Sequence, residues 1–249
     1  MENVNPVIFY AAIAAAGFIT GLGKGGLGGM IGALLTTSLA LIIPLETVLG
    51  LMLPIFIIGD AFAISFHWGN WDEHLIISLI PGAVLGITLG TYVITSTPMD
   101  TLRTILGIIV LLFIAYRIVE RKITASLVYR PKKWHGILAG IITGFTSALA
   151  HAGGPPIAIF LLMNDLAPGV FVATAALFFA IINLIKVPYY FYAGLIDFSL
   201  LLKIAWLFPF IPLGAFIGKT LTRKVDKAVF ERILLVLLTI SALLLLFKN

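Results

Sequence analysis

The residues best suited to chemistry in this sequence form a glycine-rich run, Gly21–Gly29, with Lys24 near its centre. Glycine costs about 1 kcal/mol relative to alanine at each position inside a helix, so the run predicts a break and a new helix that begins near Leu27. The free N–H groups and the positive end of such a helix attract negative charge. We therefore predict that the run binds an anion through one ammonium group and several backbone amides, from Lys24, Gly25, Gly26, Gly28 and Gly29.

A second break is predicted past the middle of the chain, at His151–Pro156, where two glycines precede two prolines. Proline suits the first turn of a helix, because the N–H that it lacks has no partner there. Two helix N-termini that face each other would form one oxyanion cage near the membrane midplane, with His151, Gly153 and Gly154 as ligands from this half. The alternative is that each break is a structural kink without a ligand.

Ionisable side chains also fall inside apolar segments, where a charge is costly and is therefore a candidate for function. Asp60 lies near the middle of its segment, and Asn183 precedes Lys186 by one helical turn, so those two share a helix face. The sequence allows an ion pair between Asp60 and Lys186. We predict that Asn183 and Lys186 contact the substrate and that Asp60 is the site of a coupling proton or cation. A purely structural ion pair is the alternative.

Other kinds of chemistry find little support. The chain has no cysteine, which excludes disulfides, thiolate metal sites and relays through thiols. His67 and His74 flank two carboxylates, but this stretch falls at an expected membrane boundary, where aromatic side chains are common, so no metal ion or other cofactor is predicted. The apolar segments hold no Ser-His-Asp arrangement and no pair of catalytic carboxylates, and we predict that the protein is not an enzyme.

The composition indicates what must position these residues. Hydrophobic residues make up 61% of the 249 and charged residues only 11%, whereas soluble domains carry about 25% charged residues. With a mean hydropathy of +1.13, the sequence predicts an all-α integral membrane protein. Because a span needs about 20 apolar residues, we divide the chain into ten apolar segments: Pro6–Leu22, Leu27–Ile43, Leu45–Phe66, Leu75–Ile94, Thr101–Val119, Gly136–Ala150, Pro155–Met163, Gly169–Tyr192, Ser199–Gly218 and Val229–Phe247.

The segments fall into two similar halves, residues 1–119 and 136–249, joined by a basic linker at residues 120–135. Five segments in a half is an odd number, so the second half would enter the membrane inverted. Pro155–Met163 has nine residues and reaches only about 14 Å as a helix, so it predicts a re-entrant piece. Two inverted repeats with re-entrant or broken helices at glycine-rich breaks are a recurring design of secondary transporters.

Matches between the halves support a duplication over chance similarity. They are Thr20-Gly21 with Thr143-Gly144 and Asp60 with Asn183, both separated by 123 positions, and Gly69–Asp72 with Gly194–Asp197. Glycines at every fourth position let helices approach closely in lipid. Helix packing is the expected role of most glycines in three such sets: Gly17, Gly21, Gly25 and Gly29; Gly136, Gly140 and Gly144; Gly82, Gly86 and Gly90.

Basic residues collect in two stretches between apolar segments, residues 117–133 and 219–232. The positive-inside rule places both stretches in the cytoplasm. We therefore predict a multi-pass protein of the cytoplasmic (inner) cell membrane with both termini outside. Since the net charge of +5 arises in these stretches, it does not indicate nucleic-acid binding.

The glycine-rich break after the first apolar segment, the Gly153–Pro156 break and the tandem halves resemble the sulfite exporter TauE/SafE family. The resemblance extends over essentially the whole chain. It implies secondary transport of sulfite, organosulfonates or other small organic anions, with export as the direction. Members are described with about eight membrane segments, and re-entrant pieces would account for the ten found here. Members often carry Gly-x-Gly-Gly in the second half, where this chain has His151 and Ala152 before its two glycines.

Residues and resemblance together predict a secondary transporter of a small anion, with alternating access around a site near the midplane of the lipid bilayer. Two alternatives belong to other functional classes of membrane protein. A passive anion channel would need no coupling residue, and a non-transporting membrane scaffold would show no flux.

Overall fold

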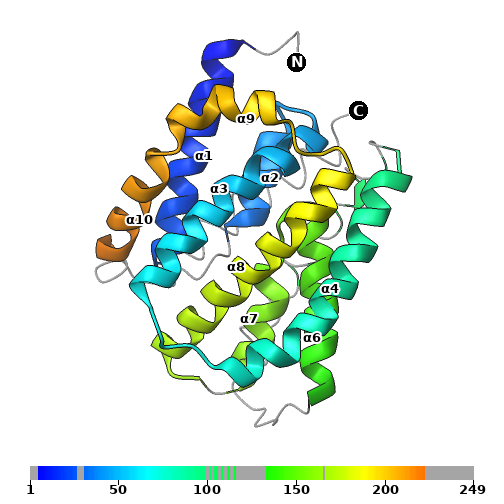
Figure 1. The fold of residues 1–249 in the computed structure, drawn as a ribbon, viewed down its shortest axis with the longest axis vertical. Coiled ribbons are helices and arrows are strands. Elements are labelled where there is room, and N and C mark those ends of the chain that lie inside the picture. Colours follow the sequence, from blue (N-terminus) through cyan, green and yellow to red (C-terminus); the bar gives the residue numbers. More distant parts are fainter. Residues whose placement is uncertain are drawn as a thin grey trace.

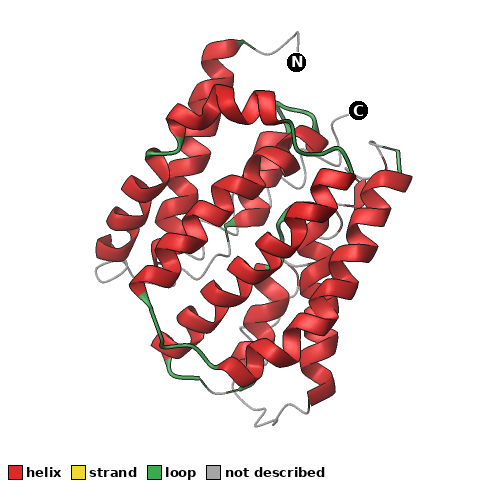
Figure 2. Cartoon of the chain, in the orientation of Figure 1, coloured by secondary structure: helices red, strands yellow, loops and turns green. Residues whose placement is uncertain are grey.

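The computed structural model describes residues 5–26, 31–98, 133–164 and 166–221, with isolated positions between 101 and 115. These residues form helices joined by short turns, with no strand among them (Figure 1, Figure 2). The helices are α1 (Pro6–Gly26), α2 (Gly32–Ala40), α3 (Leu45–Phe66), α4 (Glu73–Ser96), α6 (Lys133–Ala150), α7 (Gly154–Leu162), α8 (Pro168–Tyr192), α9 (Phe198–Ile204) with the short 3-10 helix η1 (Ala205–Leu207), and α10 (Phe210–Leu221).

Four of the described helices, α1, α3, α4 and α8, are long and apolar enough to cross a membrane. A fifth span results if α9, η1 and α10 are taken together, although they bend by 51°. The predicted segment Ser199–Gly218 is covered by these helices, and the sequence did not predict the bend within it. Pro209 lies at the bend, where proline cannot donate the backbone hydrogen bond that would continue a straight helix. The predicted segments Thr101–Val119 and Val229–Phe247 lie wholly or mostly outside the described residues, as does the linker.

The prediction that the glycine run interrupts the first helix is wrong over its first part, because α1 continues to Gly26. A β-carbon at Gly21 or Gly25 would collide with the backbone of α10, so these glycines permit close packing that offsets their low helix propensity. The N–H groups of Gly25 and Gly26 are used inside α1 and are not free for an anion. The next helix begins at Gly32 rather than near Leu27, and residues 27–30 lie outside the described part.

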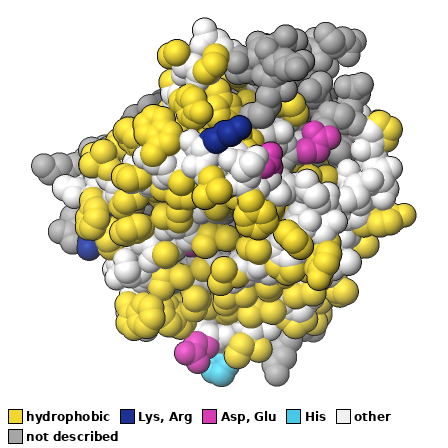
Figure 3. Space-filling model, turned by 45° about the horizontal axis from the view of Figure 1, so that its top comes forward, with side chains coloured by type: hydrophobic (Ala, Val, Ile, Leu, Met, Phe, Trp, Pro, Cys, Tyr) yellow, Lys and Arg dark blue, Asp and Glu magenta, His cyan; other side chains and the backbone are white. Residues whose placement is uncertain are grey.

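The surface of the bundle is that of a membrane protein. On the face shown in Figure 3, hydrophobic side chains form a broad band, and the charged ones gather mainly toward its two ends. Many large apolar side chains are exposed, which would be unfavourable in water over so large an area. They include Val7, Ile77, Leu85, Leu112, Leu184 and Leu202.

The helices pack as two lobes, and each lobe contains helices from both halves of the chain. α1 packs along α10, and α6 packs along α4 (Figure 1). Both contacts are made by glycines whose positions leave no room for a β-carbon: Gly21, Gly25, Gly214 and Gly218 in the first, and Gly82, Gly86, Gly90, Gly136, Gly140 and Gly144 in the second. We call α1, α2, α3, α9 and α10 the first lobe and α4, α6, α7 and α8 the second. The lobes meet where α3 packs against α8.

Matching turns lie at opposite ends of the bundle. Gly69 follows α3 with a φ of 75° and Gly194 follows α8 with a φ of 70°, a conformation that favours glycine. Asp72 and Asp197 then accept backbone hydrogen bonds at the starts of α4 and α9. The α3–α4 turn is at the bottom of Figure 1 and the α8–α9 turn is at the top, as expected for two halves that enter the membrane in opposite directions.

Candidate functional site

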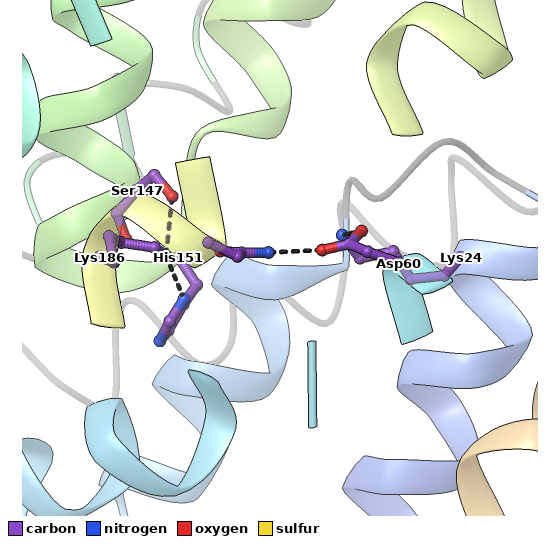
Figure 4. A network of polar contacts seen from close by, with 6 residues as sticks. Lys24, Asp60, Ser147, His151 and Lys186 are labelled. Carbon is purple, nitrogen blue, oxygen red and sulfur yellow. Dashed lines mark hydrogen bonds and ion pairs between the residues drawn. The ribbon is translucent and has the colours of Figure 1, made fainter. Parts of the chain in front are cut away.

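Six buried polar side chains gather where the two lobes meet (Figure 4). They come from α1, α3, α6, α8 and the break between α6 and α7, and none is more than 6% exposed: Lys24, Asp60, Ser147, His151, Asn183 and Lys186. Five of the six were candidates on the sequence alone. A polar group buried without partners is costly, so the contacts among these six residues define the site.

Lys24 and Asp60 form a buried ion pair between α1 and α3. The second carboxylate oxygen of Asp60 accepts a hydrogen bond from Asn183 of α8 at 2.6 Å. The Lys24 ammonium also lies 4.7 Å from the centre of the Phe179 ring, a favourable cation–π distance. The predicted ion pair between Asp60 and Lys186 is therefore wrong, because the carboxylate is taken by a lysine of its own half.

Lys186 of α8 is completely buried and is held by groups of the second half. Its ammonium nitrogen lies 3.1 Å from the Ser147 hydroxyl oxygen, 3.3 Å from the Ser147 carbonyl oxygen and 2.9 Å from His151 Nδ1. His151 Nε2 lies 3.3 Å from the carbonyl oxygen of Leu49. Since a carbonyl only accepts, Nε2 carries the hydrogen, and Nδ1 of the neutral ring accepts from the ammonium.

His151 joins the two predicted breaks. It has a φ of 51°, which makes it the only described residue other than glycine with a positive φ, and such strain is concentrated at functional sites. Its ring centre lies 4.7 Å from that of Phe56 on α3. A β-carbon at Gly32, the first residue of α2, would collide with the His151 carbonyl oxygen. The start of α2 and the α6–α7 break are therefore in contact at the centre of the protein.

The N-terminus of α7 offers two backbone donors. His151 and Ala152 use their N–H groups to close the end of α6. The N–H groups of Gly153 and Gly154 have no partner among the described residues, and the two prolines that follow have no N–H to offer. Of the predicted amide ligands, these two are free where the structure describes them, whereas Gly28 and Gly29 lie outside the described part.

The charges in this network do not balance. Among the described residues, the buried side chains with a formal charge are two lysines, Lys24 and Lys186, and one carboxylate, Asp60. Asp60 pairs with Lys24, and no described carboxylate lies within 4 Å of Lys186. Among the described residues, uncharged polar groups and the Tyr190 ring, its centre 5.8 Å away, face that ammonium. A buried cation without a counter-ion is costly. The site therefore has an excess of one positive charge beside two free amides, which suits an anion.

Sequence reasoning missed Ser147 and several hydroxyl groups. Ser147 stands 123 positions after Lys24, so the repeat offset was a signal that could have found it. Four buried threonine hydroxyls have no hydrogen-bond partner in the described part of the chain: Thr20, Thr36, Thr91 and Thr143. Two of these, Thr20 and Thr143, belong to the dipeptides that mark the repeat.

A cavity of about 440 Å³ lies between α4 and α8. Threonine and tyrosine residues are among those that line it, including Thr91 and Tyr189, and the Tyr189 hydroxyl oxygen lies 2.9 Å from the Thr88 hydroxyl oxygen. Tyr189 follows Lys186 by one turn of α8. The residues that line the cavity do not include any of the six residues of the network.

The described part of the chain contains no group of three or more His, Asp or Glu residues that could hold a metal ion. In the stretch His67–His74, Asp72 instead has a structural role. Its side chain accepts from the Leu75 amide at 3.1 Å, and its own N–H donates to the Thr174 hydroxyl at 2.9 Å. These bonds fix the start of α4 against α8.

The described helices and the buried, positively charged network indicate a membrane transporter of anions, and a comparison with protein families decides it. The family model for the sulfite exporter TauE/SafE matches residues 12–245, nearly the whole chain. The chain belongs to the TauE/SafE family. TauE/SafE proteins are multi-pass membrane transporters of sulfite or related anions and not enzymes. No curated protein and no solved structure matches this TauE/SafE chain.

Proposed function

We propose that this protein is a secondary transporter of a small anion, such as sulfite, an organosulfonate or a small organic acid. The observation that supports this most is Lys186, a completely buried lysine with no described carboxylate within ion-pair distance. An anion bound there would neutralise a charge that no described carboxylate compensates. The same anion would accept from the amides of Gly153 and Gly154 at the positive end of α7.

In this proposal the two halves have different roles. At the repeat offset of 123, Lys24 corresponds to Ser147 and Asp60 to Asn183. The first half thus holds a neutral ion pair, and the second half holds polar uncharged groups around Lys186. We assign anion binding to the second half and coupling to Asp60. Its carboxylate can bind a proton or another cation in place of the Lys24 ammonium.

Asn183 links the two roles. It donates to Asp60 at 2.6 Å and lies one turn before Lys186 on the same face of α8. A change of charge at Asp60 would therefore alter its hydrogen bond with Asn183 and so affect the segment of α8 that carries the anion site. Alternating access would arise from rocking of the first lobe against the second, because the network lies at their contact. We further propose export across the cytoplasmic membrane, with both termini outside.

The test is anion flux in proteoliposomes that contain only this protein. Sulfite, sulfoacetate and acetate are supplied in turn, and we expect saturable flux for at least one of them. Lys186→Met should remove that flux, because the anion loses its counter-charge. Lys203→Met is the matched control, since Lys203 is exposed at the end of α9. Absence of flux for every anion, or flux unchanged in Lys186→Met, would contradict the proposal.

The coupling role needs a second measurement, because a passive channel would also conduct anions. The double variant Lys24→Met with Asp60→Asn removes both charges and keeps a hydrogen-bond acceptor for Asn183. We expect it to lose uphill transport driven by a proton or sodium gradient and to keep downhill flux. Uphill transport at the wild-type rate would show that Asp60 is not the coupling site.

A further inference from the structure

Eight serine and threonine hydroxyl groups on the described helices bond back to their own helix. Such bonds run to a carbonyl three or four residues earlier from Thr37, Ser65, Ser78, Thr88, Thr95, Ser96, Thr146 and Thr220. This is the usual solution for a hydroxyl in a helix. Thr143 departs from it: its side chain is completely buried and its hydroxyl has no partner among the described residues. A buried polar group without a partner in a native protein calls for an explanation, such as a bound water or ligand.

The surroundings of Thr143 place it beside the anion site. It lies on α6 one turn before Ser147, whose hydroxyl oxygen is 3.1 Å from Lys186 Nζ. A β-carbon at Gly153 would lie 2.9 Å from the Thr143 methyl carbon and 3.1 Å from the Ser147 β-carbon. Thr143 and Ser147 therefore border the same glycine, whose N–H is one of the two free donors at the start of α7.

Thr20 is the natural comparison, because it occupies the equivalent position 123 residues earlier. Its hydroxyl is also buried and has no partner where the structure describes the chain. The neighbouring group differs, however: Thr20 stands one turn before Lys24, whose charge Asp60 already neutralises. The two threonines thus share burial, chemistry and position in their halves, and differ in whether the adjacent cation is compensated.

From this difference we propose that Thr143 is a substrate-contacting residue, whose hydroxyl donates a hydrogen bond to an oxygen of the anion, and that Thr20 makes no such contact. The proposal rests on the anion transport proposed above. It extends the site to a residue of α6 and confines it to the second half. The bound anion then receives donors from α6, α7 and α8, so its head group must offer several acceptor oxygens around one negative charge.

The experiment measures sulfite affinity of the purified full-length protein from sulfite-dependent thermal stabilisation. Thr143→Val removes the hydroxyl with little change in volume, and loss of a hydrogen bond to a charged group should weaken binding about 10-fold or more. Thr143→Ser keeps the hydroxyl and should stay within about threefold of wild type. Two controls should also stay within about threefold: Thr20→Val, and Thr146→Val, whose hydroxyl bonds to Ile142 of its own helix.

Several results would overturn the assignment. Unchanged sulfite affinity in Thr143→Val, with wild type binding normally, would mean that the hydroxyl holds only water or nothing. An equal loss in Thr20→Val would show that the site is not confined to the second half. An equal loss in Thr143→Ser would assign the effect to packing of the methyl group. If sulfite, sulfoacetate and acetate all fail to stabilise the wild-type protein, the proposed transport function fails together with the Thr143 assignment. If wild type is stabilised and Thr143→Val is stabilised equally, only the Thr143 assignment fails.

Discussion

The buried ion pair between Lys24 and Asp60 gives the sharpest prediction for stability. Asp60→Asn preserves the shape of the side chain and an acceptor for Asn183, but it leaves the Lys24 ammonium buried without a counter-charge. Removing one partner of a buried pair costs about 3–5 kcal/mol. For a chain of this size, about 2–4 °C per kcal/mol converts this into a fall in melting temperature of about 6–20 °C.

The double variant Lys24→Met with Asp60→Asn separates charge from packing. It has no unpaired charge at this position and keeps the bond to Asn183, so we expect most of the stability to return. Circular dichroism of detergent-solubilised protein at one fixed heating rate would measure all four members of the cycle, since unfolding of such proteins is commonly irreversible. A double variant no more stable than Asp60→Asn, or a fall below about 2 °C in Asp60→Asn alone, would refute the account of the pair.

Three further predictions concern packing and turns. Gly32→Ala should reduce folded yield sharply, because its β-carbon would collide with the His151 carbonyl oxygen; normal yield by fluorescence-detected size-exclusion chromatography would show that the two breaks do not meet. Gly86→Ala should do the same by forcing α4 away from α6, whereas an alanine at Gly69 meets open space and should incur only the smaller strain of its φ of 75°. Asp72→Ala removes an N-cap and should lower stability by about 1 kcal/mol, with a fall of about 2–4 °C in melting temperature; an unchanged melting temperature would contradict the capping role.

Much of the helix pattern could be predicted from the sequence, because apolar length and turn residues limit where spans begin and end. The predicted segment Leu45–Phe66 coincides with α3, and Gly169–Tyr192 differs from α8 by one residue. The short second helix of the second half was also expected from its nine apolar residues. By contrast, the bend at Pro209 escaped prediction, because a proline among apolar residues also occurs inside uninterrupted helices such as α3 and α8.

Helix propensity misled the interpretation of the glycine run. Each glycine disfavours a helix in water, but in lipid an interrupted backbone would leave polar groups unsatisfied, and α10 lies close enough to need glycine on α1. The sequence therefore shows that one side of α1 carries glycines and no large side chains. That α10 packs against this side is evident only from the three-dimensional structure.

The composition of the site was largely predictable, whereas its pairing was not. Burial of a charge in an apolar segment is visible in the sequence, so Lys24, Asp60 and Lys186 were found. Which lysine meets the carboxylate depends on the contact between α1 and α3, and sequence spacing does not specify contacts between helices. Ser147 was missed because a single serine in a helix is common.

The most direct test of the central claim supplies the missing counter-charge within the chain. Ser147→Asp would place a carboxylate next to the Lys186 ammonium, which now lies 3.1 Å from the serine hydroxyl oxygen. If an anion normally fills that role, Ser147→Asp should raise the melting temperature without ligand and abolish stabilisation by sulfite, whereas Ser147→Asn, of the same shape without the charge, should not gain stability. Sulfite stabilisation of Ser147→Asp equal to that of wild type would contradict the claim that Lys186 is the cation that binds the transported anion.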